Sequence, residues 1–498
     1  MAERTAVRVR MYRQGLGDCF LLTFDPGGTE RHVLIDCGTL GATTTGVKLA
    51  DVAKDIHDTT GRHIDLLIAT HEHWDHVRGF HDQLAIFQDI TFDHAWLAWT
   101  ENPKDCLAKK IAARKEDLGT ALAHAAEALT RSTDPASRDA GGAVQDILGF
   151  FGGDTGLGAA KFSETVNAAM NFVRKEAAPD VRFCKPGEGP FEESWLEGFR
   201  FYVMGPPYDE DALFNTGNKG SSELYGVAAG LKSGARFLLA RQAAAAAGTT
   251  VTLDEREDFV ASHPFDQRFR VEHDGPRARD MFDSTYFTKS EEWRQVEEDW
   301  LHAASDFALQ LDDATNNTSL ALAIERVSDG RVLLFPADAQ QGNWLSWHDK
   351  AMTWTVQEGS RTREVRAVDL LSKTVFYKVG HHSSHNATAK AKGLELMNNE
   401  NELVAFIPVD RKVALTRNPK GSWRMPAFSL YRRLLEKCQG RVVRSDLGWA
   451  DDAANAADPS VEKEFVGLGK TAEWTGWKKA QQAAPVQISN LYIDYMLT

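Results

Sequence analysis

Four potential metal ligands lie close together near residue 70: His71, His73, Asp75 and His76 fall within six residues. Residues two apart in an extended chain project to the same side, so His71 and His73 are expected to point together. Asp75 and His76 come where the chain turns toward the next helix, and they can face a second metal. Imidazole nitrogens and carboxylate oxygens together suit zinc, manganese or iron. The cluster therefore predicts a metal site.

This spacing favours hydrolytic chemistry. Two divalent ions a few ångströms apart can hold a bridging hydroxide as nucleophile and neutralise charge in the transition state. The alternative is a set of surface loop residues, which a lone histidine would favour but this combination does not. The apolar run 64–69 directly precedes the cluster and predicts a short buried strand. In layered α/β folds, sites are commonly built at the C-terminal ends of strands.

Two further predicted strand ends carry candidate ligands. Asp338 ends an apolar run, where a carboxylate is costly to bury without partners. We expect Asp338 to bridge both metals, the alternative being an aspartate that caps a turn. His381 and His382 follow another apolar run, where the alternative is a hydrogen-bonded core histidine. We assign His381 to the second metal and His382, with Asp75, to catalysis, and the sequence leaves open which of the two histidines is the ligand.

Asp36 also ends an apolar run, at residues 32–36. Histidines that bind metals usually donate their other ring N–H to a carboxylate, a carbonyl or water. We therefore expect Asp36 to orient a ligand histidine through a hydrogen bond rather than to bind metal itself.

Strand and helix patterns alternate along the chain and place these residues at strand ends. Strands are predicted at residues 7–11, 19–24, 32–36, 64–69, 199–204, 319–324, 332–338, 374–379, 403–409 and 442–444. Helical spacing occurs at 47–60, 103–131, 160–177 and 426–438, whereas the glycine-rich stretch 141–158 predicts a flexible loop. We interpret residues 101–180 and 208–312, the latter without a chemical motif, as insertions into a single domain spanning 1–498.

The composition is that of an ordinary soluble globular protein, with 43% hydrophobic and 26% charged residues. The net charge of −14 disfavours a general nucleic-acid coat, although it leaves room for a local basic groove. Five cysteines occur without CxxC pairing, which favours a reducing compartment over a disulfide scaffold. The chain starts without an apolar signal core, and its alanine-rich run is too short to span a bilayer. These features predict a soluble, cytoplasmic protein that does not act in a membrane.

The stretch His71–His76 resembles the HxHxDH signature of metallo-β-lactamase-fold hydrolases, and Asp36, Asp338 and His381 match further positions in the right order. More narrowly, the chain resembles the ComEC-like subgroup, the C-terminal hydrolase domain of a DNA-uptake protein. The pieces that carry this second resemblance are residues 15–19, 316–320, 333–339, 378–384 and 440–448. The resemblance implies an α/β fold, an αββα sandwich of two mixed sheets flanked by helices, with large, mostly helical insertions. It also implies phosphodiester hydrolysis.

We expect one metal to be held by the pair His71 and His73 together with Asp338. The other metal is expected to be held by Asp75, His76, Asp338 and His381, with Asp75 also orienting the hydroxide. The family's third histidine is missing before the strand that leads to Asp338, and Asn316 and Asn317 stand near its place as supporting residues. An asparagine oxygen is a weaker ligand, which implies a loosely held first metal or manganese rather than zinc. The family's HHGS form reads HHSS here.

Substrate contacts are expected from two segments. Ser383, Ser384, His385 and Asn386 offer hydroxyl, imidazole and amide groups for a phosphate oxygen or a leaving group. Trp423 has the alternatives of base stacking and packing. A basic segment is expected to attract a phosphate backbone, the alternative being a solvated helix face. Its ten basic residues, against the single acidic Glu436, are Arg411, Lys412, Arg417, Lys420, Arg424, Arg432, Arg433, Lys437, Arg441 and Arg444.

Three function classes follow. The first is a phosphodiesterase or nuclease with two divalent metal ions, zinc or manganese, acting on a phosphodiester substrate that includes nucleic acid. The second is a hydrolase of another bond, such as a thioester, lactam or ester. The third is a regulatory protein with a vestigial site that binds a protein partner through the insertions. The missing third histidine and the HHSS form favour the first class.

Overall fold

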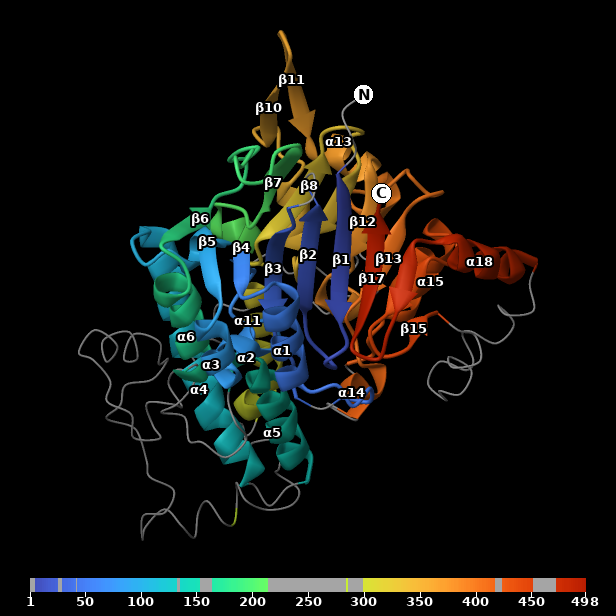
Figure 1. Ribbon diagram of the computed structural model, residues 1–498. Helices are drawn as coiled ribbons and strands as arrows, with labels where there is room; N and C mark the ends of the chain where they lie inside the picture. The colour runs from blue at the N-terminus through green and yellow to red at the C-terminus, as the bar shows by residue number, and fades with distance from the viewer. Residues whose placement is uncertain are drawn as a thin grey trace.

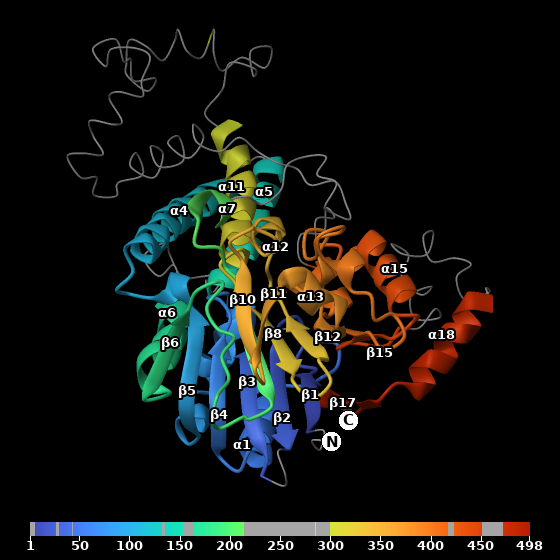
Figure 2. The ribbon, with the colours of Figure 1, turned by 90° about the horizontal axis from the view of Figure 1, so that it is seen from above.

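The computed structural model describes residues 5–25, 29–41, 43–131, 135–152, 164–213, 284, 299–416, 423–450 and 472–498. Two mixed sheets lie back to back, and helices cover their outer faces, as Figure 2 shows from above. This arrangement confirms the predicted sandwich. Most of the predicted insertion at 208–312 lies outside the described residues, so its proposed role in docking partners stays a prediction, as does the single-domain assignment.

The first sheet has eight strands in the order β16, β17, β1, β2, β3, β4, β5, β6. Strands β1 to β3 are antiparallel, and β3 to β6 run parallel. Their bounds are β1 Ala6–Tyr12, β2 Cys19–Asp25, β3 Arg31–Cys37, β4 His63–Ala69, β5 Thr91–Ala98, β6 Asp180–Cys184, β16 Val486–Ile488 and β17 Tyr492–Leu497.

The second sheet has seven strands in the order β15, β14, β13, β12, β9, β8, β7. Strands β7 to β9 are antiparallel, whereas β9, β12, β13 and β14 run parallel. The bounds are β7 Phe199–Gly205, β8 Ala321–Arg326, β9 Val332–Phe335, β12 Thr374–Lys378, β13 Val404–Ile407, β14 Val442–Arg444 and β15 Gly448–Trp449. A separate hairpin of β10 (Thr353–Glu358) and β11 (Arg361–Arg366) projects from the molecule (Figure 1).

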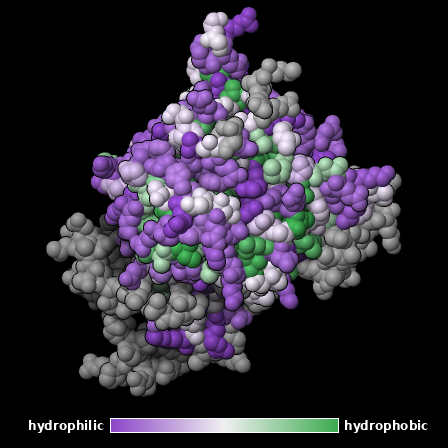
Figure 3. Space-filling view, viewed as in Figure 1, coloured by the Kyte–Doolittle hydropathy of each residue, from purple (hydrophilic) through white to green (hydrophobic). Residues whose placement is uncertain are grey.

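An aromatic core joins the two sheets. Phe20 of β2 packs edge-on against Phe335 of β9, and Phe335 contacts Phe376 of β12. These side chains are at most 2% exposed, and burying each stabilises the fold by roughly 1.5–3 kcal/mol. On the face drawn in Figure 3, polar side chains dominate and apolar ones form only small patches. The inter-sheet core fixes the relative position of strand ends from both halves of the chain.

Helices form the outer layers. α1 (Leu49–Thr59) and α2 (Trp74–Asp82) pack on the first sheet, and α12 (Gln341–Ser346), α13 (Ala367–Ser372) and α15 (Phe428–Lys437) pack on the second. The remaining bounds are α3 Leu84–Gln88, α6 Glu164–Asn171, α7 Glu210–Leu213, α14 Arg411–Thr416 and α18 Ala472–Ala483. Among the helices in the described ranges, none combines the length and apolar character needed to cross a bilayer.

Three helices from the segments predicted to be insertions form a layer of their own: α4 (Cys106–Thr130), α5 (Pro135–Leu148) and α11 (Asp299–Asn316) contact one another (Figures 1 and 2). We call these three helices the inserted layer. The predicted loop at 141–158 is wrong for its first half, because residues 141–148 belong to α5. Gly141 lies so near α4 that a Cβ there would come 2.8 Å from the Cβ of Leu129. This glycine therefore serves close helix packing instead of a turn.

The strands differ from the predictions in two ways: one strand ends earlier than predicted, and some strands were not predicted. β9 ends at Phe335 instead of continuing to Asp338, because Pro336 has no amide hydrogen for the ladder. β5, β6, β16 and β17 were not predicted from the sequence. The first half of β5 contains the polar residues Asp93 and His94, which interrupt an apolar pattern.

Candidate metal centre

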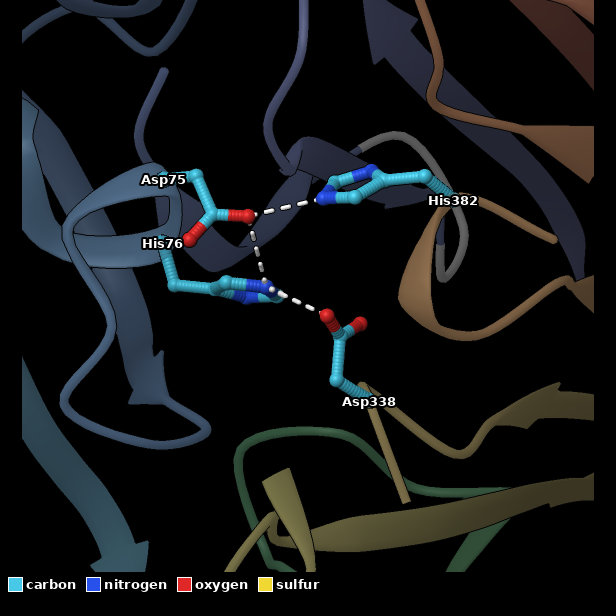
Figure 4. Close-up of side chains that lie close together, drawn as sticks. All are labelled: Asp75, His76, Asp338 and His382. Carbon is cyan, nitrogen blue, oxygen red and sulfur yellow. Dashed lines mark hydrogen bonds and ion pairs between the residues drawn. The ribbon is translucent and has the colours of Figure 1, made fainter. Parts of the chain in front are cut away.

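Four buried side chains converge between the two sheets: Asp75, His76, Asp338 and His382 each offer one ligand atom, and these atoms all lie within 4.8 Å of one another. We call them the four-ligand group (Figure 4). The Nε2 of His382 lies 2.7 Å from the Oδ2 of Asp75. The Nε2 of His76 lies 3.2 Å from the Oδ2 of Asp338 and 3.7 Å from that of Asp75. Each side chain is at most 1% exposed.

The carboxyl ends of parallel strands bring this group together. Asp75 and His76 follow β4 in the first turn of α2, where the helix N-terminus favours a carboxylate. Asp338 follows β9, and His382 follows the neighbouring strand β12. Because these strands belong to different sheets, the two halves of the group meet only when the sandwich closes.

The loop between β1 and β2 fixes the backbone of Asp75. The amide of Asp18 donates to the Asp75 carbonyl at 2.9 Å. Gly17 and Gly38 pack against the same carbonyl: a Cβ on Gly38 would lie 2.1 Å from the carbonyl carbon of Asp75. Only glycine leaves room for this approach, so the glycine-containing turns hold the start of α2 in place.

Two histidines of the group have their outer ring nitrogen engaged. The Nδ1 of His76 lies 2.8 Å from the Oδ2 of Asp36, which is the contact that an orienting Asp36 requires. Asp36 is itself held by Thr70, whose amide and hydroxyl donate to the carboxylate at 2.8 and 2.6 Å. The Nδ1 of His382 lies 2.6 Å from the carbonyl oxygen of Pro408, beyond β13. Both rings therefore present Nε2 to the group.

Lys378 is a buried cation at the back of the group, and the sequence analysis assigned it no role. Its ammonium contacts Asp18 and donates to the Oδ1 of Asp338 at 2.9 Å. Burial opposes its charge, but the two carboxylates outweigh burial and raise the pKa of Lys378. Lys378 and His76 likewise outweigh burial at Asp338 and hold its pKa well below the usual range. The His381 amide also donates to Oδ1, so Oδ2 is the Asp338 oxygen that faces His76.

His71 and His73 form a second pair beside the four-ligand group. The Nε2 of His71 lies 3.1 Å from the Nδ1 of His73. The Nδ1 of His71 faces the hydroxyls of Thr70 and Ser319 at 3.2 and 3.3 Å. Burial lowers the pKa of His71 well below its usual value and that of His73 to about 4. Both rings are thus neutral at pH 7, as metal ligands must be.

Of the two histidines that follow β12, His382 and not His381 lies in the four-ligand group. The sequence assigned His381 to the second metal, but His382 occupies the four-ligand group. His381, His382 and Ser383 have φ angles of 44°, 50° and 65°, so three consecutive residues are left-handed. This strained turn directs the His382 ring inward and leaves His381 near α11, where its Nε2 is 3.4 Å from the Nδ2 of Asn316.

Asp312 of α11 is a buried acidic neighbour of the site that the sequence analysis overlooked. Its Oδ1 lies 3.8 Å from the Nε2 of His73, and its Oδ2 accepts from the Asn316 amide at 3.1 Å. Burial raises its pKa well above the usual value, and the nearby carboxylates Asp313, Asp75 and Asp338 add to that shift. Asp312 and Asn316 are four residues apart on a helix, a spacing that places them on one face and was a usable signal.

Asn317 lies apart from the cluster. Its Oδ1 accepts hydrogen bonds from the amides of Gln340 and Asn343, and its Nδ2 donates to the carbonyl of Leu213. Asn317 therefore supports the loop that follows β9, whereas Asn316 contacts Asp312 and His381 directly.

The segment expected to contact substrate is largely buried beside the group. The Ser383 hydroxyl and the Asn386 Oδ1 are buried without hydrogen-bond partners, while the Asn386 amide donates to the Oδ1 of Asp313 at 3.1 Å. Burial raises the pKa of Asp313 to about 6 and lowers that of His385. The Ser384 amide donates to the His381 carbonyl and tightens the turn.

The basic segment does not present a row of free cations. Arg433 pairs with Glu395, Arg444 with Asp446, and Lys437 with Glu400. Arg417 and Lys420 lie outside the described residues. Trp423 is 5% exposed and packs on Phe150, so its contacts there are those of a core residue. These contacts favour the alternatives, a solvated helix face for the basic segment and packing for Trp423.

The donor set fits divalent metal ions. Among the described residues, buried atoms without hydrogen-bond partners include the Oδ1 of Asp75 and the Nε2 of His76. The carboxylates around these atoms outnumber the nearby ammonium of Lys378, and bound divalent cations would balance the remaining negative charge. Imidazole nitrogen and carboxylate oxygen together suit zinc or manganese.

Comparison with known proteins agrees with this geometry. The family model described as the metallo-beta-lactamase superfamily matches residues 12–157, which include Asp36 and His71–His76. No curated protein matches the chain. Asp338 and His382 lie beyond the match, and the sandwich brings them to it. The match at residues 12–157, the two-sheet fold and the buried histidine and aspartate cluster agree with a metallo-beta-lactamase fold, which supports a metal-dependent hydrolase.

Proposed function

We propose that this protein is a phosphodiesterase that uses two divalent metal ions. The observation that carries the proposal is the carboxylate-rich ligand set, in which Asp75 and Asp338 stand together with His76 and His382. Carboxylate ligands favour hard cations such as manganese, and hard cations prefer the oxygens of a phosphoryl group. Two such ions, when bound, would activate water and neutralise the negative charge on the phosphoryl and leaving-group oxygens during in-line displacement.

The protein's own groups divide the remaining work. Asp75 keeps one oxygen without a hydrogen-bond partner, and this oxygen orients the attacking water and accepts its proton. Lys378 and the His381 amide hold Asp338 in one orientation through its Oδ1. The Ser383 hydroxyl and the Asn386 amide group bind phosphate oxygens. His382, placed within 2.7 Å of Asp75, belongs with the ligands in this proposal and not with the proton-transfer groups.

Among phosphodiesters, the charges around the site favour small substrates over long nucleic acids. Because the basic residues near α15 are largely paired with acidic ones, they give little support to a long nucleic-acid groove. We therefore place small phosphodiesters first and nucleic acid second among the substrates, with the activity located in the cytoplasm. The resemblance to the ComEC-like subgroup is the main support for nucleic acid.

A panel of substrates tests the proposal. Purified protein with manganese or zinc would be incubated with bis(4-nitrophenyl) phosphate, labelled single- and double-stranded DNA and RNA, a chromogenic cephalosporin and a thioester. The expected result is phosphodiester hydrolysis that His76→Ala abolishes. Hydrolysis of the cephalosporin or thioester alone would overturn the phosphodiesterase proposal. Bound metal without hydrolysis of any substrate would support the binding-protein alternative.

A further inference from the structure

In a ligand histidine, one ring nitrogen binds the metal and the other, the outer nitrogen, points away from it. The hydrogen bond of the outer nitrogen fixes the orientation of the ring. A neutral imidazole carries one N–H and one lone pair, so the partner of the N–H selects the nitrogen that binds metal. In this protein, hydroxyls, a carboxylate and a carbonyl face the outer nitrogens of His71, His76 and His382. Each of these partners lies on the β-sandwich, close to a strand end.

His73 is the remaining histidine, and its ring is turned the other way. Its Nδ1 faces the Nε2 of His71 at 3.1 Å, so Nδ1 is the nitrogen on the metal side. Its Nε2 is buried without a hydrogen-bond partner. The rings of Phe150 and Phe151 flank the His73 ring, and their centroids lie 5.5 and 4.9 Å from the centroid of that ring. A buried N–H left unpaired among such apolar groups costs about 1–3 kcal/mol.

Asp312 is the acceptor that stands opposite this nitrogen. Its Oδ1, also buried without a hydrogen-bond partner, lies 3.8 Å from the Nε2 of His73. The Asn316 amide holds the other oxygen at 3.1 Å, so the carboxylate is already aimed. A small movement of the His73 ring toward Asp312 makes a normal hydrogen bond.

We propose that Asp312 is the positioning residue for His73: it accepts a hydrogen bond from the Nε2–H and so keeps the Nδ1 lone pair for the first metal. The inference rests on the metal centre of the proposed function. Asp312 is not assigned as a ligand to that same metal, because the two nitrogens of an imidazole ring point in divergent directions. The inserted helix α11 thus provides for His73 what Asp36 provides for His76.

Metal affinity tests the proposal without requiring activity. In the full chain, Asp312→Leu removes the acceptor, whereas Asp312→Asn keeps an amide oxygen in nearly the same place. Asp313→Asn is the matched control, because the Asp313 carboxylate faces Gln340 and Asn386 instead of His73. Zinc affinity would be measured by competition with a chromogenic chelator, and the ligand field by the visible spectrum of the cobalt-loaded protein.

The expected result is a 10- to 100-fold loss of affinity at one of two metals in Asp312→Leu, a size typical of outer partners of ligands. Asp312→Asn and Asp313→Asn should stay within a few-fold of the wild type, and all variants should bind two metals at saturation with an unchanged cobalt spectrum. Loss of one metal and an altered spectrum in Asp312→Asn would overturn the proposal in favour of direct ligation. Unchanged affinity in Asp312→Leu would overturn it as well. Neither result depends on phosphodiester hydrolysis, so the two proposals fail separately.

Discussion

The strand ends of the β-sandwich and the inserted layer contribute to the same site with different precision. At the strand ends, four polar contacts within the four-ligand group and behind it are 2.6–3.2 Å long, although the Nε2 of His76 and the Oδ2 of Asp75 are 3.7 Å apart. From α11, the Asp312 carboxylate comes within 3.8 Å of His73. Hydrogen-bonded strands on both sides define a strand end, whereas α11 is held by helix packing. Groups that must sit within tenths of an ångström therefore come from the sandwich.

A partly buried ion pair connects the two regions. Glu72, which lies between His71 and His73 in the sequence, pairs with Lys115 of α4. Burial alone would raise the pKa of Glu72, but Lys115 outweighs it and lowers that pKa. The histidine loop is consequently tied to the inserted layer at a point outside the ligand set. A change in the packing of α4 is expected to reach the metals through this pair.

The largest effect is expected from removing a side chain of the four-ligand group, which the strand ends of the sandwich hold in place. His76→Ala removes a ligand held between Asp338 and Asp36, and we expect activity to fall by at least about 100-fold, because even outer partners of ligands cost 10- to 100-fold. Metal content measured by elemental analysis should fall by one ion. His81→Ala on the same helix is the control, since the His81 side chain is 40% exposed and remote from the group. Equal losses in both variants would contradict the assignment of His76.

The next effect concerns the cation between the sheets. Lys378→Met leaves Asp18 and Asp338 buried without their counter-charge, so the free energy of unfolding of the metal-free protein should fall by about 3–5 kcal/mol. Urea denaturation measures this loss. Lys373→Met is the control, because its side chain is 41% exposed and its ion pair is worth about 0–1 kcal/mol. A Lys378→Met variant as stable as Lys373→Met would show that the buried pairs contribute little.

A smaller effect tests the inserted layer alone. Gly141→Ala places a methyl group 2.8 Å from the Leu129 Cβ, and overpacking of this kind costs roughly 1–3 kcal/mol. Gly142→Ala is the matched control: its Cβ meets open space, so the better helix propensity should stabilise by up to about 1 kcal/mol. Thermal unfolding compares the two. Opposite signs are expected, and zinc affinity should weaken only in Gly141→Ala, through the Glu72–Lys115 pair.

The smallest effect tests whether the left-handed backbone of the turn after β12 is strained. Ser383 has a φ of 65°, and its hydroxyl makes no hydrogen bond, so Ser383→Gly should raise the free energy of unfolding by about 1 kcal/mol. Ser384→Gly is the control, because Ser384 has an ordinary φ of −60° and glycine there costs roughly 0.5–1 kcal/mol. Chemical denaturation of both variants distinguishes relief of strain from a general effect of glycine. A destabilised Ser383→Gly variant would contradict the strain.

The metal cluster and the fold class were predictable because their signals are local. His71 to His76 lie within six residues that join β4 to the first turn of α2, and the apolar runs of β3, β4, β9 and β12 are each shorter than eight residues. The two sheets were predicted from the resemblance to metallo-β-lactamase-fold hydrolases, and the structure confirms them. β5 escaped prediction because polar residues occupy its half-buried start, which breaks the apolar pattern.

Other features depend on contacts between distant segments, and these the sequence alone did not determine. The choice of His382 over His381 follows from the left-handed turn after β12, which packing against β13 and Asp338 maintains. The helical state of Gly141 follows from its approach to α4. Asp312 reaches His73 because α11 packs on α4 and α5. Local spacing thus predicted which residues gather at the candidate metal centre, and long-range packing decided which of their atoms face one another.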